Sequence, residues 1–183
     1  MKKQVPHIVL GVTGSIAAYK SADIVRLIRK RGWEVSVIMT RGATEFITEL
    51  TLRTLSRHPV GTEMFARDSE WYPEHISMAD RASALLIAPC TANVMAKLAH
   101  GISDDLLSCT ALACPAPLIV APAMNVRMWE HPATQANLKT LLGRGATVVD
   151  PGEGDLACGA QGRGRMADVE AILDVLERVV APR

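Results

Sequence analysis

Short runs of apolar residues recur along the chain, and longer stretches of mixed polarity separate them. The runs are rich in β-branched residues and are continuous rather than alternating with polar positions. Continuous runs are typical of strands that are covered on both faces, as in a parallel sheet. The predicted strands are His7 to Leu10, Val35 to Met39, Ala84 to Ala88, Leu118 to Ala121 and Thr147 to Val149.

The stretches between these runs have the period of amphipathic helices. Ala18, Ala22, Val25 and Ile28 form one apolar stripe, and Gly32 follows as a typical helix stop. Strands that alternate with helices imply right-handed βαβ units. We therefore expect one α/β domain over residues 1–183, a doubly wound Rossmann-like or flavodoxin-like parallel sheet with helices on both faces. Further helices are predicted over Thr44 to Ser56, Asn93 to Ala99, Asp104 to Ala113, Pro132 to Leu142 and Asp168 to Val180.

Two stretches fit neither a strand nor a helix. Gly61 to Glu74 is polar and irregular, and Asp150 to Arg165 is rich in glycine. Long irregular segments inside a compact domain are usually functional or mobile. We expect both to be loops that serve a site.

Composition narrows the class of protein. The formal net charge is +1, with 20 Lys and Arg against 19 Asp and Glu, so no basic surface for nucleic acid or an acidic membrane is expected. The longest apolar runs are too short for a membrane span, and no secretory signal follows Met1. The four cysteines form no C-x-x-C pair and no zinc-ligand spacing. They are expected to be free thiols of a cytoplasmic protein without a bound metal.

Small polar residues follow three of the predicted strands. In a doubly wound sheet, ligands bind beyond the carboxyl ends of the strands. The glycine spacing after the first strand is G-x-x-G-S rather than G-x-G-x-x-G, and no acidic residue closes the second strand. These features favour a mononucleotide phosphate over a dinucleotide, with an ordinary strand-to-helix turn as the alternative. The candidate cofactor residues are Gly14, Ser15, Thr40, Thr91, Ala92 and Asn93.

Three further residues are candidates for a functional rather than a purely structural role. His75 comes at the end of the first irregular stretch, where a surface histidine is the alternative. Asn125 follows the fourth predicted strand, where asparagine also serves as a plain helix cap. Cys158 lies in the glycine-rich stretch, which is a poor place to bury an inert thiol.

Together these signals form a set of motifs. They are G-V-T-G-S-I-A-A-Y-K at 11–20, H-I at 75–76, A-P-C-T-A-N at 88–93 and G-I-S-D-D-L-L at 101–107, followed by P-A-M-N at 122–125, M-W-E-H-P-A-T-Q-A-N at 128–137 and A-C-G-A-Q-G-R-G-R-M at 157–166. With them the chain resembles the homo-oligomeric, flavin-containing cysteine decarboxylases. It is most similar to the phosphopantothenoylcysteine decarboxylases of coenzyme A biosynthesis, over nearly its whole length. The P-A-M-N and A-C-G segments are the specific markers.

The resemblance implies FMN bound by the six candidate cofactor residues named above. It implies an active-site histidine at His75, a ligand for the substrate carboxylate at Asn125 and an acid on a flap at Cys158. The reaction would pass from a thioaldehyde to an enethiol, and would convert 4'-phosphopantothenoylcysteine to 4'-phosphopantetheine. The candidate substrate contacts are Lys20, Met124, Arg163 and Arg165.

The resemblance also implies an assembly and a domain boundary. The family builds its site between subunits of a trimer, or of a dodecamer of four trimers, so His75 is expected to face a neighbour's flavin. Members often carry a fused synthetase domain, which this chain is expected to lack. Two alternatives stay open: a peptidyl-cysteine decarboxylase of antibiotic maturation and a non-catalytic FMN-binding regulatory subunit. The glycine-rich loop argues against the first, and the presence of His75, Asn125 and Cys158 argues against the second.

Overall fold

Six parallel strands form the central sheet of the protein. The computed structural model describes residues 5–65, 74–155, 159 and 161–181. The strand order is β3-β2-β1-β4-β5-β6, the order of the Rossmann fold, so the predicted doubly wound sheet is confirmed. Of these six strands only the edge strand β3 was not predicted, because two residues are too short to leave a pattern. The strands are β1 (His7–Val12), β2 (Glu34–Met39), β3 (Val60–Gly61), β4 (Ala84–Cys90), β5 (Leu118–Pro122) and β6 (Thr147–Val148).

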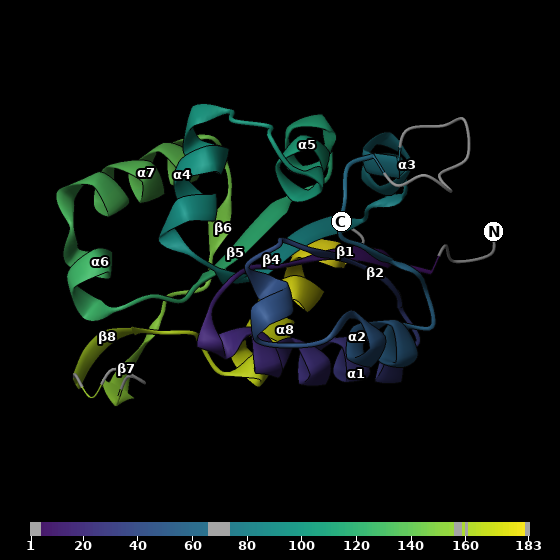
Figure 1. The fold of residues 1–183 in the computed structure, drawn as a ribbon, viewed down its shortest axis with the longest axis horizontal. Helices are drawn as coiled ribbons and strands as arrows, with labels where there is room; N and C mark the ends of the chain where they lie inside the picture. Colours follow the sequence, from purple (N-terminus) through teal and green to yellow (C-terminus); the bar gives the residue numbers. More distant parts are fainter. Residues whose placement is uncertain (1–4, 66–73, 156–158, 160, 182–183) are drawn as a thin grey trace.

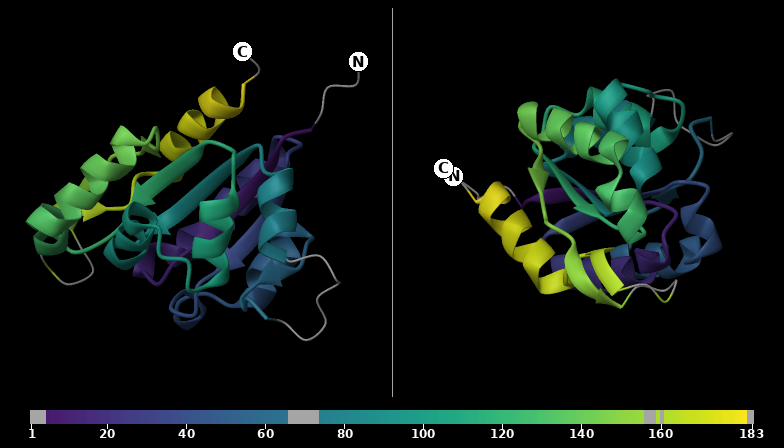
Figure 2. Two further views of the ribbon diagram at one scale, coloured as in Figure 1. Left: turned by 90° about the horizontal axis from the view of Figure 1, so that it is seen from above. Right: turned by 90° about the vertical axis from the view of Figure 1, so that its left-hand side faces the viewer.

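Helices cover both faces of this sheet (Figures 1 and 2). Strand β1 shows why the sequence folds into layers, because Ile8 and Leu10 join the core on one face while Val9 joins the core on the other. The first core is completed by α1 (Ser21–Lys30), α2 (Glu49–Ser56) and α8 (Val169–Val180). The second is completed by α3 (Glu74–Arg81), α4 (Ala92–His100), α5 (Leu106–Ala113), α6 (Val126–Glu130) and α7 (Pro132–Gly143).

Two predicted helices begin later than their apolar pattern suggests. The segment predicted as one helix over 44–56 contains a 3-10 turn at Ala43–Glu45, and α2 begins only after Thr48. The Thr48 hydroxyl accepts a hydrogen bond from the Thr51 amide at 3.2 Å, which caps the helix there. The first helix is likewise preceded by a 3-10 helix at Ile16–Lys20. In both places a side-chain hydroxyl offers the backbone a local partner that the hydrophobic period does not reveal.

The glycine-rich stretch, expected to be irregular, contains an antiparallel hairpin. Its strands are β7 (Gly152–Asp155) and β8 (Gln161–Arg165), and it lies below α6 in Figure 1. Gly154, Gly162 and Gly164 have φ values of +151°, +149° and +148°, a conformation that side-chain-bearing residues rarely adopt. The hairpin therefore depends on glycines, which are depleted from ordinary strands.

No helix in the described ranges is both long and apolar enough to cross a bilayer.

Candidate active site

The strand order reverses its direction between β1 and β4, and the loops after these two strands meet there. Thr13 joins them directly. Its hydroxyl donates to the Pro89 carbonyl at 2.7 Å and accepts from the Thr91 amide at 3.1 Å. Because Thr13 is fully buried, these bonds fix the two loops against each other. A crevice at this point of a doubly wound sheet is where nucleotides bind.

A cavity of about 620 Å³ occupies this crevice. Pockets of this size hold ligands of cofactor dimensions. The structure brings all six candidate cofactor residues to its wall, together with one of the candidate substrate contacts. These residues are Gly14, Ser15, Thr40, Thr91, Ala92, Asn93 and Met124.

The floor of the cavity is formed where two loops approach very closely. A Cβ atom on Gly14 would lie 3.0 Å from the Gly42 carbonyl carbon, and one on Gly42 would lie 3.3 Å from the Gly14 Cα. Because neither glycine carries a side chain, the two loops pack closely and a ligand can pack directly against their backbone. The backbone amides at the start of α4, behind its cap Thr91, supply donors for an anion. Glycine floor, hydroxyls and amides together fit a flavin mononucleotide.

Charged residues on the cavity wall were not predicted. They are Arg41, Lys97 and Asp105. Arg41 directly follows Thr40 at the end of β2, so its place beyond the strand was a usable signal. Lys97 lies four residues after Asn93 on α4, which places both on one face of the helix.

Asn125 adjoins the cavity at the start of α6. Its side-chain Oδ1 accepts a hydrogen bond from the Arg127 amide at 2.8 Å. Asn125 therefore caps α6, which was the alternative role considered for it from the sequence. The preceding Met124 amide donates to the Gly164 carbonyl at 3.0 Å. The hairpin strand β8 is thereby held against the segment that carries Asn125, and α6 packs on β8.

His75 is not brought to the cavity within one chain. It is the second residue of α3 rather than part of a loop, and α3 packs against α5. Among the described residues that line the cavity, His75 is absent. Cys158 lies outside the described residues, between β7 and β8 in sequence.

The cationic candidates for substrate binding separate into two places. Lys20 and Arg165 both approach Asp168, at 3.9 and 3.4 Å. They line a small hollow together with Asp168. Arg163 instead pairs with Asp150 at 3.1 Å, and its guanidinium lies 5.9 Å from the centre of a tryptophan ring, that of Trp129.

The described cysteines are free, and two of them are shielded. Burial raises the pKa of the Cys90 thiol to about 12. Burial also raises the pKa of Cys114. Neither thiol is poised to ionise near neutral pH, so both fit a structural role.

Comparison with known proteins identifies the family. The model of the family described as "Flavoprotein" matches residues 1–181. A probable phosphopantothenoylcysteine decarboxylase of Streptococcus mutans is 42% identical over 172 residues, which cover 93% of this chain and 96% of that protein. The coenzyme A biosynthesis bifunctional protein CoaBC of Bacillus subtilis is 43% identical over 172 residues, 94% of this chain. This chain spans only 42% of that bifunctional relative.

Solved structures agree with this assignment. A cysteine-to-serine variant of a phosphopantothenoylcysteine decarboxylase, complexed with pantothenoylaminoethenethiol, superposes with a TM-score of 0.86 at 31% identity and covers 96% of this chain and 98% of that one. The FMN-dependent cysteine decarboxylase SpaF matches with a TM-score of 0.80 at 30% identity, over 94% of this chain and 98% of its own. The chain belongs to the flavoprotein family and, as its motifs predict, to the flavin-containing cysteine decarboxylases within it.

Proposed function

We propose that this protein catalyses the FMN-dependent decarboxylation of 4'-phosphopantothenoylcysteine to 4'-phosphopantetheine in coenzyme A biosynthesis. The observation that carries the proposal is the cavity at the β1/β4 crevice, whose wall holds all six candidate cofactor residues. The segment with Asn125 and the glycine-rich hairpin lie directly beside it. The relatives named for this reaction support the choice of substrate.

Different residues of the cavity would contact different parts of the cofactor. Gly14 and Gly42 allow the backbone to approach it, while Ser15, Thr40 and Thr91 offer hydroxyl groups. The amides of Ala92 and Asn93, at the start of α4, favour its phosphate. When bound, FMN supplies reversible oxidation of the substrate's CH2–SH group, which gives the electrons of the breaking C–C bond a sink.

The side chains near the substrate orient it and move protons. Asn125 binds the carboxylate through its amide without forming an ion pair, which would oppose the departure of CO2. His75 positions the carboxylate or moves a proton before or during CO2 loss. Cys158 then donates the proton that completes the product. The solved relative is a cysteine-to-serine variant complexed with pantothenoylaminoethenethiol, and such a complex supports this order of steps.

The substrate's phosphate is assigned to Lys20 and Arg165. These two cations converge on one exposed carboxylate, Asp168, which a phosphate can replace. Arg163 is the weaker choice because Asp150 and Trp129 already engage it. Met124 remains a candidate substrate contact because it lines the cofactor cavity.

The assembly and location belong to the same proposal. Because His75 lies away from the cavity of its own chain, a neighbouring subunit in a trimer, or in a dodecamer of trimers, supplies it. Residues 1–183 act as a single decarboxylase domain and need no synthetase domain for this step. The reaction takes place in the cytoplasm, where free thiols such as Cys109 and Cys114 persist.

Product analysis tests the function. The purified protein is expected to be yellow and to release FMN on heating. With phosphopantothenoylcysteine it should form a product lighter by one CO2, detected by mass spectrometry. A peptide ending in cysteine is the comparison substrate. Turnover of the peptide alone would make the protein a peptidyl-cysteine decarboxylase, and turnover of neither, with FMN bound, would favour a regulatory role.

A further inference from the structure

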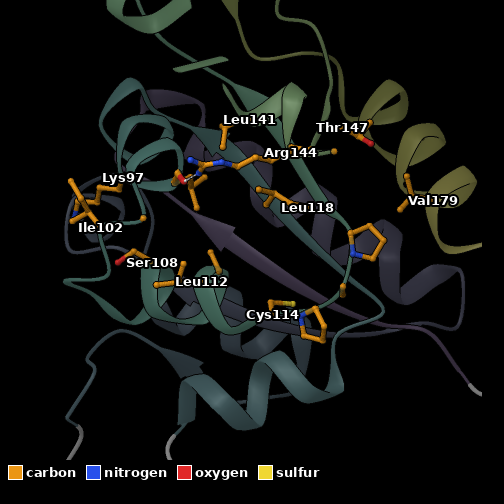
Figure 3. A pocket seen from close by; sticks show the side chains of 18 of the residues that line it. Lys97, Ile102, Ser108, Leu112, Cys114, Leu118, Leu141, Arg144, Thr147 and Val179 are labelled. Carbon is orange, nitrogen blue, oxygen red and sulfur yellow. Dashed lines mark hydrogen bonds between the residues drawn. The ribbon is translucent and has the colours of Figure 1, made fainter. Parts of the chain in front are cut away.

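The contact between α4 and the start of α5 places two carboxylates around one lysine. The Lys97 ammonium on α4 lies 2.6 Å from a carboxylate oxygen of Asp104 and 2.8 Å from one of Asp105. The lysine side chain is only 17% exposed, whereas Asp104 is 59% exposed. Figure 3 shows a neighbouring cavity, with Lys97 and Ser108 on the same side of it.

Asp105 cannot turn away from the lysine. One of its carboxylate oxygens accepts from the Ser108 amide at 2.8 Å and caps α5, and the other faces Lys97. The Ser108 hydroxyl in turn accepts from the Asp105 amide at 3.1 Å, which completes a capping box. Burial opposes ionisation of Asp105, but the hydrogen bonds from Lys97 and Ser108 outweigh it and lower its pKa. The carboxylate is therefore a fixed negative charge.

Lys97 and Asp105 both line the cofactor cavity, where the only other charge on the described wall is that of Arg41. An anionic cofactor in that cavity shares it with Asp105, and Asp104, the preceding residue, adds a second carboxylate beside the lysine. Without the lysine, the negative charge of Asp105 on the wall, together with that of the more exposed Asp104, would disfavour a phosphate-bearing ligand. The single positive charge of Lys97 offsets one of the two negative charges and so lowers that repulsion. Ordering the lysine side chain costs little conformational entropy, because both carboxylates hold it in place.

We propose that Lys97 is a positioning residue whose ammonium offsets the negative charge of Asp105 in the cavity wall and of the adjoining Asp104, so that an anionic flavin can bind there. The inference rests on the proposed function only in taking FMN as the ligand. It predicts a defect that depends on charge and that can be reversed by removing the carboxylates. A residue with a merely structural role would not show this reversal.

The test measures cofactor affinity rather than turnover. Apoprotein is titrated with FMN and with riboflavin, which lacks the phosphate, and quenching of flavin fluorescence gives each Kd. Lys97→Met keeps the length of the side chain but removes its charge, and should raise the Kd for FMN about tenfold or more, with a smaller effect on riboflavin. Lys97→Arg should restore most of the affinity. Lys139→Met makes the same change on the exposed face of α7 and should leave both Kd values unchanged.

The decisive variant is Lys97→Met combined with Asp104→Asn and Asp105→Asn. Asparagine keeps the cap of α5 while removing the negative charge, so FMN affinity should return to near the parent value. The inference is overturned if Lys97→Met binds FMN as the parent does, or if the triple variant binds as weakly as Lys97→Met. Thermal unfolding of each apoprotein reports whether the variant is folded. A parent protein that binds no FMN would instead refute the proposed function.

Discussion

At the scale of single residues, the order of events separates Cys158 from His75. If Cys158 acts only after CO2 has left, Cys158→Ser should still oxidise substrate and release CO2. Its final step should slow by about a hundredfold or more, because a hydroxyl is a far weaker acid than a thiol. The enethiol should then accumulate beside reduced flavin. Anaerobic single-turnover mixing, with flavin absorbance and mass analysis of trapped products, measures both.

His75→Asn provides the contrasting variant in the same experiment. It removes a group needed before or during CO2 loss, and should bind FMN normally yet form neither CO2 nor enethiol. Turnover of Cys158→Ser at the parent rate would show that the thiol is not the acid. Failure of Cys158→Ser to release any CO2 would place Cys158 earlier in the sequence of steps than proposed.

The residues of the candidate site could be predicted from the sequence where the topology of the sheet alone determines their position. Gly14, Thr40 and Thr91 follow strand ends, and parallel strands bring their carboxyl ends to one edge. Lys97 and Asp105 were missed because they reach the cavity from within a helix and from a loop remote in sequence. Asn125 shows a different limit of sequence analysis. The same side chain caps α6 and lies at the candidate site, so the sequence pattern of a helix cap does not exclude a role in the site.

At the scale of elements, the β7–β8 hairpin depends on close backbone contact with the segment before α6. A Cβ atom on Gly164 would collide with the Met124 carbonyl oxygen, and the φ of +148° is itself strained for alanine. Gly164→Ala should therefore displace the hairpin and reduce kcat/KM about tenfold or more. FMN affinity should change little, because Gly164 does not line the cofactor cavity.

Gly143→Ala is the matched control for that variant. Gly143 ends α7 and lacks a positive φ, and a Cβ atom there would meet no other atom within 4 Å. Alanine at this position should be neutral or slightly stabilising. Steady-state kinetics and flavin titration of both variants make the comparison. Normal kcat/KM in Gly164→Ala would show that the hairpin's position does not matter for the reaction.

The same hairpin shows which elements a hydrophobic pattern cannot reveal. Its strands carry glycines at 152, 154, 162 and 164 and few apolar residues, so neither a period of two nor a buried run marks them. The paired strands are held instead by their contact with Met124 and Val126, which is a tertiary interaction. Four of the five predicted strands, β1, β2, β4 and β5, are by contrast almost wholly buried and leave a strong apolar signal, whereas β6 is half-buried.

At the scale of the whole molecule, stability should fall in acid through groups at the edge of the sheet opposite the cavity. Burial, followed by the nearby charges of Arg81 and His58, holds the pKa of His7 below its ordinary value of 6.5. As pH falls below 6.5, the unfolded chain therefore takes up this proton before the folded protein does, and unfolding becomes more favourable. Hydrogen bonds from His58 and Arg29 also lower the pKa of Glu34, which adds a loss of stability at still lower pH.

His7→Gln isolates the first of these contributions. Free energies of unfolding in urea are measured at about pH 7.5 and about pH 5.5 for the parent and the variant, on either side of the ordinary histidine pKa. The decrease on acidification should be smaller in the variant, whereas the values at the higher pH report the lost contact between the His7 ring and the Ser36 hydroxyl, 2.9 Å apart. An equal decrease in both proteins would mean that His7 is not the titrating group.

The final prediction concerns how subunits share a site. His75 lies on α3, away from the cavity of its own chain, while Asn125 lies beside that cavity. If a trimer completes each site with a neighbour's histidine, one site draws His75 and Asn125 from different chains. Oligomers refolded from equal amounts of His75→Asn and Asn125→Ala chains should then contain sites with both parent residues. With random mixing, about a quarter of sites should be intact, although each variant alone is inactive.

Light scattering and activity of the mixture test this arrangement together. The expected result is a mass of three subunits or a multiple of three, with activity that appears only after joint refolding and not after mixing of preformed oligomers. Sites built from a single chain would give no recovery, because every chain carries one inactivating change. Full activity in a protein with the mass of a monomer would contradict the shared site directly, and would require α3 to bring His75 to its own cavity.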